Sequence, residues 1–92
     1  MVTAIVLINS ERDKISELAQ NIADMKGVSE VFSIAGRYDL VAIVKVRQMD
    51  DLAEVVSDAM RKQKGILETE TLIAFRAFSH SEMEVGFDLG LD

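Results

Sequence analysis

Hydrophobic and polar residues follow two rhythms along this chain, and the rhythms recur in the same order. Runs of β-branched and aliphatic residues are typical of strands, and apolar residues spaced three and four apart are typical of helices. The pattern predicts strand, helix, strand, and then strand, helix, strand again, at 2–9, 11–25, 29–35, 40–47, 51–62 and 67–78. We therefore expect one βαβ unit used twice.

Residues that favour helix ends agree with these bounds. Ser10 is a favoured N-cap residue, and Asp51 with Glu54 resembles a capping box at the start of the second helix. Gly27 and Gly65 stand where the two helices are expected to end, because glycine readily adopts the left-handed conformation that closes a helix. Each predicted helix thus has its own start and stop signals.

Two βαβ units with right-handed crossovers predict an α+β fold, the ferredoxin-like βαββαβ plait. The strands at 2–9 and 40–47 are the most apolar, which indicates central positions in the sheet. The strands at 29–35 and 67–78 carry glutamates, which suit sheet edges. A chain of 92 residues is long enough for one such domain, and we assign it to residues 1–79.

The central strands are apolar on both faces, although the two helices of this plait cover only one. Ile5 and Leu7 alternate with other aliphatic residues in the first strand, and Val41 and Ile43 do so in the third. An uncovered apolar face of this size predicts association. Because a second copy packed about a two-fold axis is the usual solution, we expect an obligate homodimer of the dimeric α/β-barrel type.

Residues 80–92 form a C-terminal tail beyond the plait. Apolar residues occupy every second position from Met83 to Leu91, which is typical of a strand. The segment 81–84 instead has the capping-box pattern of a short helix, and a frayed acidic terminus is a third interpretation. We expect a turn or short helix at 81–85, followed by residues that pack on the dimer, for example as an extra edge strand.

Charge and composition narrow the partners. The 16 acidic residues outnumber the 10 basic ones, which gives a net charge of −6. Affinity for nucleic acid comes largely from basic side chains, and RNA-binding plaits stack bases on aromatic residues that the central strands here lack. No apolar run approaches the length of a membrane span. The chain has no cysteine and no signal-type start, so these features do not indicate export. We expect a cytoplasmic domain with no direct nucleic-acid or membrane partner.

The groups that catalysis needs do not cluster in the sequence. His80 is the only histidine, and nothing near it in the sequence suggests a nucleophilic triad. Histidine, cysteine and carboxylate residues do not occur at metal-ligand spacing, and there is no glycine-rich phosphate loop. We therefore expect no enzymatic activity, no metal and no cofactor.

The turn between the second and third predicted strands is the most concentrated polar feature. Gly36, Arg37, Tyr38 and Asp39 stand where a plain hairpin would use Asn-Gly or Asp-Gly. Asp39 can accept from the ammonium of an amino acid, and Arg37 or turn amides can hold its carboxylate. Alternatively, the glycine serves only a positive φ, Asp39 bonds turn amides, and Arg37 pairs weakly with Asp39 in solvent.

The segment G-R-Y-D-L at 36–40, leading into V-A-I-V, resembles the G-x-Y-D-[LY] signature of one regulatory domain. That domain is the effector-binding (RAM) domain of the Lrp/AsnC transcription regulators. Residues 3–8, 28–31 and 70–73 resemble its first, second and closing strands, so the likeness covers roughly residues 2–78. Most members carry an N-terminal helix-turn-helix, and because the domain begins near residue 2 here, the chain resembles a stand-alone form.

The resemblance implies sheet-to-sheet dimers that assemble into higher homo-oligomers. It also implies that an amino acid or related metabolite binds between subunits, close to the turn. The residues that the resemblance carries over are the effector loop and two pocket donors on the last strand: Gly36, Arg37, Tyr38, Asp39, Thr69 and Thr71. Full-length Lrp/AsnC relatives are further candidate partners.

Three hypotheses stay open at this point. The first is an effector-sensing module that modulates assembly or transcription regulation through partners. The second is an oligomerisation or interaction module that binds no small molecule. The third, with the poorest support because no acid–base pair is evident, is a small dimeric α+β barrel enzyme.

Overall fold

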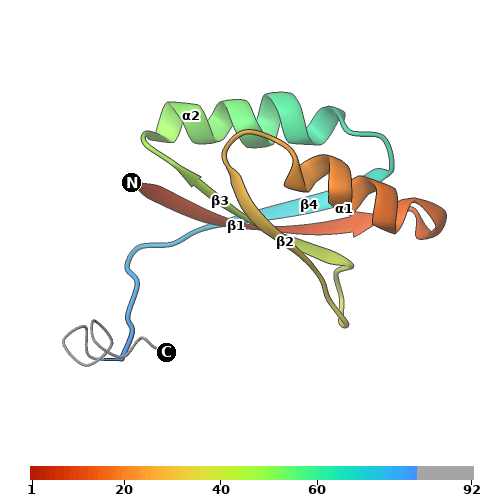
Figure 1. Ribbon diagram of the computed structural model, residues 1–92, viewed down its shortest axis with the longest axis horizontal. Coiled ribbons are helices and arrows are strands. Elements are labelled where there is room, and N and C mark those ends of the chain that lie inside the picture. The colour runs from red at the N-terminus through yellow and green to blue at the C-terminus, as the bar shows by residue number, and fades with distance from the viewer. Residues whose placement is uncertain (81–92) are drawn as a thin grey trace.

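The computed structural model describes residues 1–80 and confirms the predicted α+β plait (Figure 1). The helices and strands follow one another as β1 (Val2–Ser10), α1 (Ile15–Ala23), β2 (Val28–Ser33), β3 (Leu40–Val46), α2 (Met49–Ala53) and β4 (Ile66–Ile73). A 3₁₀ turn, Arg12–Lys14, precedes α1. After α2 the chain stays helical through a π-helical segment, Glu54–Ala59, and a 3₁₀ turn, Met60–Lys62.

The sheet has the strand order β2-β3-β1-β4, and every neighbouring pair is antiparallel. The two most apolar strands therefore occupy the centre, as the sequence predicts. In the β1–β3 pair Val2 lies opposite Val46 and Ile8 lies opposite Leu40. Both helices cover the same face of the sheet, and the other face is open (Figure 1).

The start of the first helix differs from the prediction. Ser10 is the last residue of β1 and not an N-cap, and its Oγ donates to the carbonyl of Glu11 at 2.9 Å. The α-helix begins only at Ile15. The Ser10 amide is held in the strand by the carboxylate of Asp39 at 2.9 Å, so helical structure begins one residue later than predicted, with the 3₁₀ turn at Arg12.

The second helix and the last strand also differ in their bounds. Gln48 is the N-cap of α2, and the carboxylate of Asp51 accepts the Gln48 amide at 3.3 Å, so Asp51 caps the helix from inside its first turn. β4 ends at Ile73, short of the predicted residue 78. The amide of Ala74 still donates to the carbonyl of Thr3 at 2.9 Å, after which the chain leaves the sheet.

The core lies between the helices and one face of the sheet. Its buried apolar residues come from β1, α1, β3, α2 and the helical segments after α2: Ala4, Val6, Ile8, Leu18, Ile22, Leu40, Ala42, Val44, Val46, Leu52, Val56 and Met60. The alternate positions of the central strands point to the open face, and all but the exposed Lys45 are half-buried. That face therefore keeps apolar surface in contact with solvent in a single protomer.

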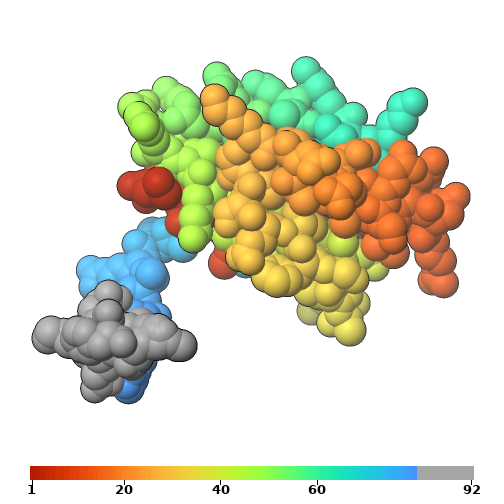
Figure 2. Space-filling view, viewed as in Figure 1, coloured from red at the N-terminus to blue at the C-terminus, as the bar shows by residue number. Residues whose placement is uncertain are grey.

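The chain beyond the sheet carries two more apolar side chains. Phe75 is 100% exposed and Phe78 is 86% exposed. Figure 2 shows this segment, in blue, apart from the body of the domain. The predicted tail at 80–92 lies outside the described residues except for its first residue, so the predicted boundary at residue 79 stays a prediction. Within residues 1–80 no helix has the length and apolar character that crossing a membrane requires.

Candidate functional site

The turn between β2 and β3 is closed by the main chain. The amide of Ile34 donates to the carbonyl of Asp39 at 2.9 Å. The tip that this bond leaves, which we call the β2–β3 turn, consists of Gly36, Arg37, Tyr38 and Asp39. Gly36 has a φ of +144°, a conformation that side-chain-bearing residues rarely adopt, and a Cβ there would meet no atom within 4 Å. Glycine is therefore needed at this position for backbone conformation and not for space.

Asp39 joins the turn to the end of β1. Its amide donates to the carbonyl of Ile8 at 3.0 Å, and its Oδ2 accepts the amide of Ser10 at 2.9 Å. Ser10 is 5% exposed, so its amide would lack a partner without this carboxylate. The bond is the kind that the sequence suggests for Asp39, a carboxylate holding a main-chain amide, but the amide belongs to another strand.

Tyr38 reaches from the turn across the open face of the sheet. Its hydroxyl donates to Oε1 of Glu70 at 2.7 Å. Glu70 lies opposite Leu7 on the open-face side of β4, so the phenol crosses β1 to reach its partner. The hydrogen bond to the Glu70 carboxylate, together with desolvation and the charges of Glu70 and Glu68, raises the pKa of Tyr38 above its ordinary value of 10.0.

Arg37 is the turn's remaining charged group. It is exposed, and within the described residues its guanidinium takes part in no hydrogen bond or ion pair. In residues 1–80, Arg37 and Asp39 therefore do not form the ion pair that was considered from the sequence. Among the turn's polar side chains, Arg37 is the one with all its donors available to another molecule.

Thr69 and Thr71 lie on the other side of the sheet from the Tyr38–Glu70 contact. They pair with Ile8 and Val6, whose side chains are buried under the helices, whereas Glu70 between them faces the open side. Thr69 is half-buried and Thr71 is exposed. The six predicted residues are therefore not assembled into one cavity within a single protomer.

Thr69 helps to line a polar hollow of about 450 Å³. Its lining comes from the start of β4 and the end of residues 49–62, the continuous helical stretch that we call the second helical region: Arg61, Ile66, Leu67, Glu68 and Thr69. Ile66 of the lining pairs with Ser10 of β1, and the amide of Ser10 is bound by Asp39 of the turn. The hollow and the turn therefore lie at the same end of the sheet.

Sequence reasoning missed three of these participants. Glu70 stands between the two predicted threonines, but its role depends on which face of β4 meets Tyr38. Ser10 is a residue type that is favoured at helix starts, and we interpreted it as a helix cap. Arg61 belongs to a basic helix end, which is ordinarily explained by the helix dipole. Each becomes visible only when strand order and register are known.

These features define a class of protein. It is an α+β plait with a polar turn and polar β4 side chains at one sheet end, beside an open apolar face. In residues 1–80 no three His, Cys, Asp or Glu side chains are grouped so that they could hold a metal ion.

Comparison with known proteins identifies the family. The model of the Lrp/AsnC ligand binding domain family matches residues 3–83, and the chain belongs to that family. An HTH-type transcriptional regulator of Pyrococcus horikoshii is 33% identical over 76 residues, which are 79% of this chain and 51% of that protein. The chain thus spans about half the length of the curated relatives it matches.

Solved structures agree in fold. The structure of TTHA0845 from Thermus thermophilus is similar with a TM-score of 0.82 and 40% identity, over 87% of this chain and 100% of that one. The transcriptional regulator NMB0573 from Neisseria meningitidis, solved in complex with L-Met, has a TM-score of 0.77 at 14% identity, over 88% of this chain and 54% of that one. The second likeness shows the fold alone.

Family membership confirms two predictions. The resemblance drawn from the β2–β3 turn is confirmed, because the same family is matched over nearly the whole described chain. The prediction that the domain is not an enzyme is also confirmed, because the family consists of regulatory ligand-binding domains. The chain is therefore a regulatory ligand-binding domain of Lrp/AsnC type.

Proposed function

We propose that this chain is an effector-sensing module that binds an amino acid or a related small metabolite between subunits. Ligand binding then changes the preferred assembly and, through partners that include full-length relatives, the regulation of transcription. A ligand shifts such an equilibrium only by its different affinities for the two assemblies. Membership of a ligand-binding family and the chemistry of the turn both support this function.

The observation that carries the proposal is the separation of the turn from the two threonines. Tyr38 contacts Glu70 on the open face, whereas Thr69 and Thr71 lie on the side that faces the helices. A site that uses both sets must combine the turn of one subunit with β4 of another. This geometry favours a ligand at a subunit interface.

The open face supports the homodimer on which such a site depends. Its centre consists of half-buried aliphatic residues of β1 and β3, and Phe32 and Leu72 extend it at 48% and 44% exposure. Charged residues, including Glu30 and Lys45, lie around this centre. An apolar centre inside a polar rim is the usual composition of a protein interface.

The turn offers partners for both charges of an amino acid. Arg37 is available for a carboxylate, and its planar guanidinium suits two parallel hydrogen bonds. Asp39 uses Oδ2 for Ser10, which leaves Oδ1 for an ammonium. The L-Met complex of the Neisseria meningitidis regulator is a structural relative's example of a bound amino acid.

A thermal-shift panel of amino acids and their 2-oxo acids tests the proposal. A bound ligand stabilises the folded protein by RT ln(1 + [L]/Kd), about 2.7 kcal/mol at a hundredfold excess over Kd. Arg37→Ala and Thr71→Val should each reduce the shift produced by a hit. Lys62→Ala, an exposed charge on the second helical region, is the control that should keep it.

A flat response across the panel would favour a module that oligomerises and binds no small molecule. One observation supports that second candidate: Tyr38 and Asp39 already have partners inside the protomer. Both candidate functions require an oligomer, and light scattering distinguishes an oligomer from a monomer. Ile43→Asp on the open face should give a monomer, and Ala53→Asp on the exposed side of α2 should not.

A further inference from the structure

A larger hollow lies at the opposite end of the sheet from the β2–β3 turn. Its volume is about 720 Å³, within the range of roughly 300–1,000 Å³ that is usual for small-molecule sites. Val46 lines it and pairs with Val2, whereas Leu40 beside the turn pairs with Ile8, so the length of β1 separates the two places. The hollow opens between the end of α1 and the second helical region.

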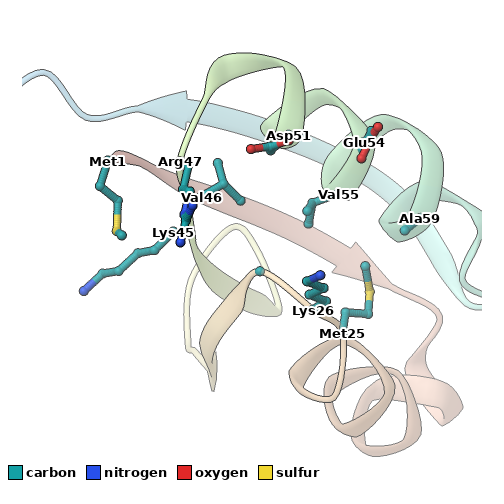
Figure 3. A pocket seen from close by; sticks show the side chains of 11 residues that line it. Met1, Met25, Lys26, Lys45, Val46, Arg47, Asp51, Glu54, Val55 and Ala59 are labelled. Carbon is teal, nitrogen blue, oxygen red and sulfur yellow. The ribbon is translucent and has the colours of Figure 1, made fainter.

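The floor of the hollow is apolar and tightly packed. Gly27, with a φ of +94°, lies so close to its neighbours that a Cβ would be 2.9 Å from Cγ2 of Val55 and 3.3 Å from Cγ1 of Val46. Figure 3 shows Val55 and Ala59 directed from the second helical region toward Met25, which lies in the loop after α1. An apolar group that enters here meets side chains on both walls.

Charges of both signs surround this floor. Asp51 and Glu54 belong to the second helical region, whereas Lys26 follows α1 and Arg47 follows β3 (Figure 3). Within the described residues Lys26, Arg47 and Glu54 form no hydrogen bond or ion pair, and Asp51 uses Oδ2 for the amide of Gln48. Anions and cations thus face the same space from different elements without neutralising one another.

The helix that lines the hollow has irregular geometry. The π-helical segment Glu54–Ala59 supplies Glu54, Val55 and Ala59. π-Helical turns are rare, because they interrupt the regular hydrogen bonding of an α-helix, and they occur frequently at functional sites. The sequence here has ordinary α-helical spacing, so the irregular turn coincides with the wall of the hollow and not with a helix-breaking residue.

We propose that this hollow is a second small-molecule site, which takes a small zwitterion with an apolar side chain. Lys26 and Arg47 hold its carboxylate, Asp51 and Glu54 hold its ammonium, and the apolar floor contacts its side chain. Free amino acids and short peptides share this chemistry. The inference goes beyond the proposed function, since the site lies within one protomer and away from the turn.

Amide chemical shifts in a ¹H–¹⁵N titration identify the site that is used. The probes are L-leucine, the dipeptide leucyl-leucine, and 4-methyl-2-oxopentanoate, which keeps the carboxylate and side chain of leucine but lacks the ammonium. L-Leucine or the dipeptide should shift the amides of Gly27, Val46 and Val55. The tighter of the two identifies a free amino acid or a peptide as the natural class, and the oxo acid should bind about tenfold more weakly, as for the loss of a charge-assisted hydrogen bond.

Variants test the assigned roles. Lys26→Ala and Glu54→Gln should each weaken binding about tenfold for the same reason. Ala59→Leu should block the hollow without disturbing the core, because Ala59 is exposed. Lys62→Ala should bind as the unmodified chain does.

Three results would overturn the inference. One is that neither L-leucine nor the dipeptide shifts the amides around the hollow at millimolar concentration. Another is binding that survives Ala59→Leu, and the third is an oxo acid that binds as tightly as leucine. Shifts confined to the β2–β3 turn and Thr71 would remove this second site while supporting the proposed function, so the two failures are distinguishable.

Discussion

At the end of the sheet that carries the β2–β3 turn, most polar side chains are bound to the protein itself, whereas at the end that carries the larger hollow they line open space. Asp39 holds the Ser10 amide and Tyr38 holds Glu70. Lys26, Arg47 and Glu54 have no such partner within residues 1–80. Polar residues in a conspicuous motif are therefore partly structural, and polar residues without a motif can be the ones available to a ligand.

The glycines at the two ends differ in the same way. Gly27 is confined by Val55 and Val46, and its positive φ comes with a crowded Cβ position. Gly36 also has a positive φ, but the space around it is empty. The hollow's floor is thus built by packing, while the turn is built by backbone conformation and hydrogen bonds.

Replacing the two glycines by alanine should give the largest effect and the clearest contrast. Gly27→Ala combines left-handed strain with a clash against the stiff β-branched Val55, and we expect it to lower the free energy of unfolding by about 2–4 kcal/mol. Gly36→Ala carries only the backbone strain, about 1–2 kcal/mol. Urea denaturation measures both values. Equal losses of unfolding free energy in the two variants would show that the clash at Gly27 costs nothing beyond the backbone strain.

Asp39→Ala should have the next largest effect. It removes the acceptor of the Ser10 amide, and an unpaired donor at a residue that is 5% exposed costs about 1–3 kcal/mol of unfolding free energy. Asp39→Asn keeps an acceptor oxygen and should recover part of the loss in the same denaturation experiment. If Asp39→Ala were as stable as the unmodified chain, the carboxylate would have no structural role, and a purely ligand-binding role would be favoured.

Much of the fold could be predicted from the sequence because hydrophobic periodicity reports burial directly. The apolar strands became the central β1 and β3, and Gly27 and Gly65 have the positive φ angles expected of helix ends. Bounds were less accurate where a tertiary contact decided them. Ser10 stays in β1 because a side chain from a distant turn binds its amide, and no local pattern encodes that choice.

The candidate site was only partly predictable. The residue types of the turn indicated a binding loop, but the face on which Tyr38 lies depends on strand order and register. Thr69 and Thr71 were predicted as pocket donors from the sequence, but only the pleat of β4 shows that their side chains lie on the face away from Glu70. The π-helical segment was not predictable, since its apolar residues have regular helical spacing and the hollow arises where two helix ends meet the sheet.

The smallest expected effect concerns the Tyr38–Glu70 contact. It tests whether a hydrogen bond inside the protomer holds the side chain of Tyr38. The chain has one tyrosine, so an ultraviolet titration of the phenol reports this residue alone. Its pKa should lie above 10.0, because the hydrogen bond to the Glu70 carboxylate favours the protonated phenol. A pKa raised by folding means that this contact stabilises the protein at neutral pH and that its contribution is lost as the pH rises through that value.

Glu70→Gln should lower the pKa of Tyr38 toward 10.0, because it removes both the carboxylate acceptor and its charge. Glu68→Gln is the matched control, since Glu68 acts only through its charge and should change the pKa less. An unchanged pKa in Glu70→Gln would mean that Tyr38 does not bind Glu70 in solution. The phenol would then be available to a neighbouring subunit or a ligand. Asp39 would be the one turn side chain still bound within the protomer, so the contrast between the two ends would be weaker.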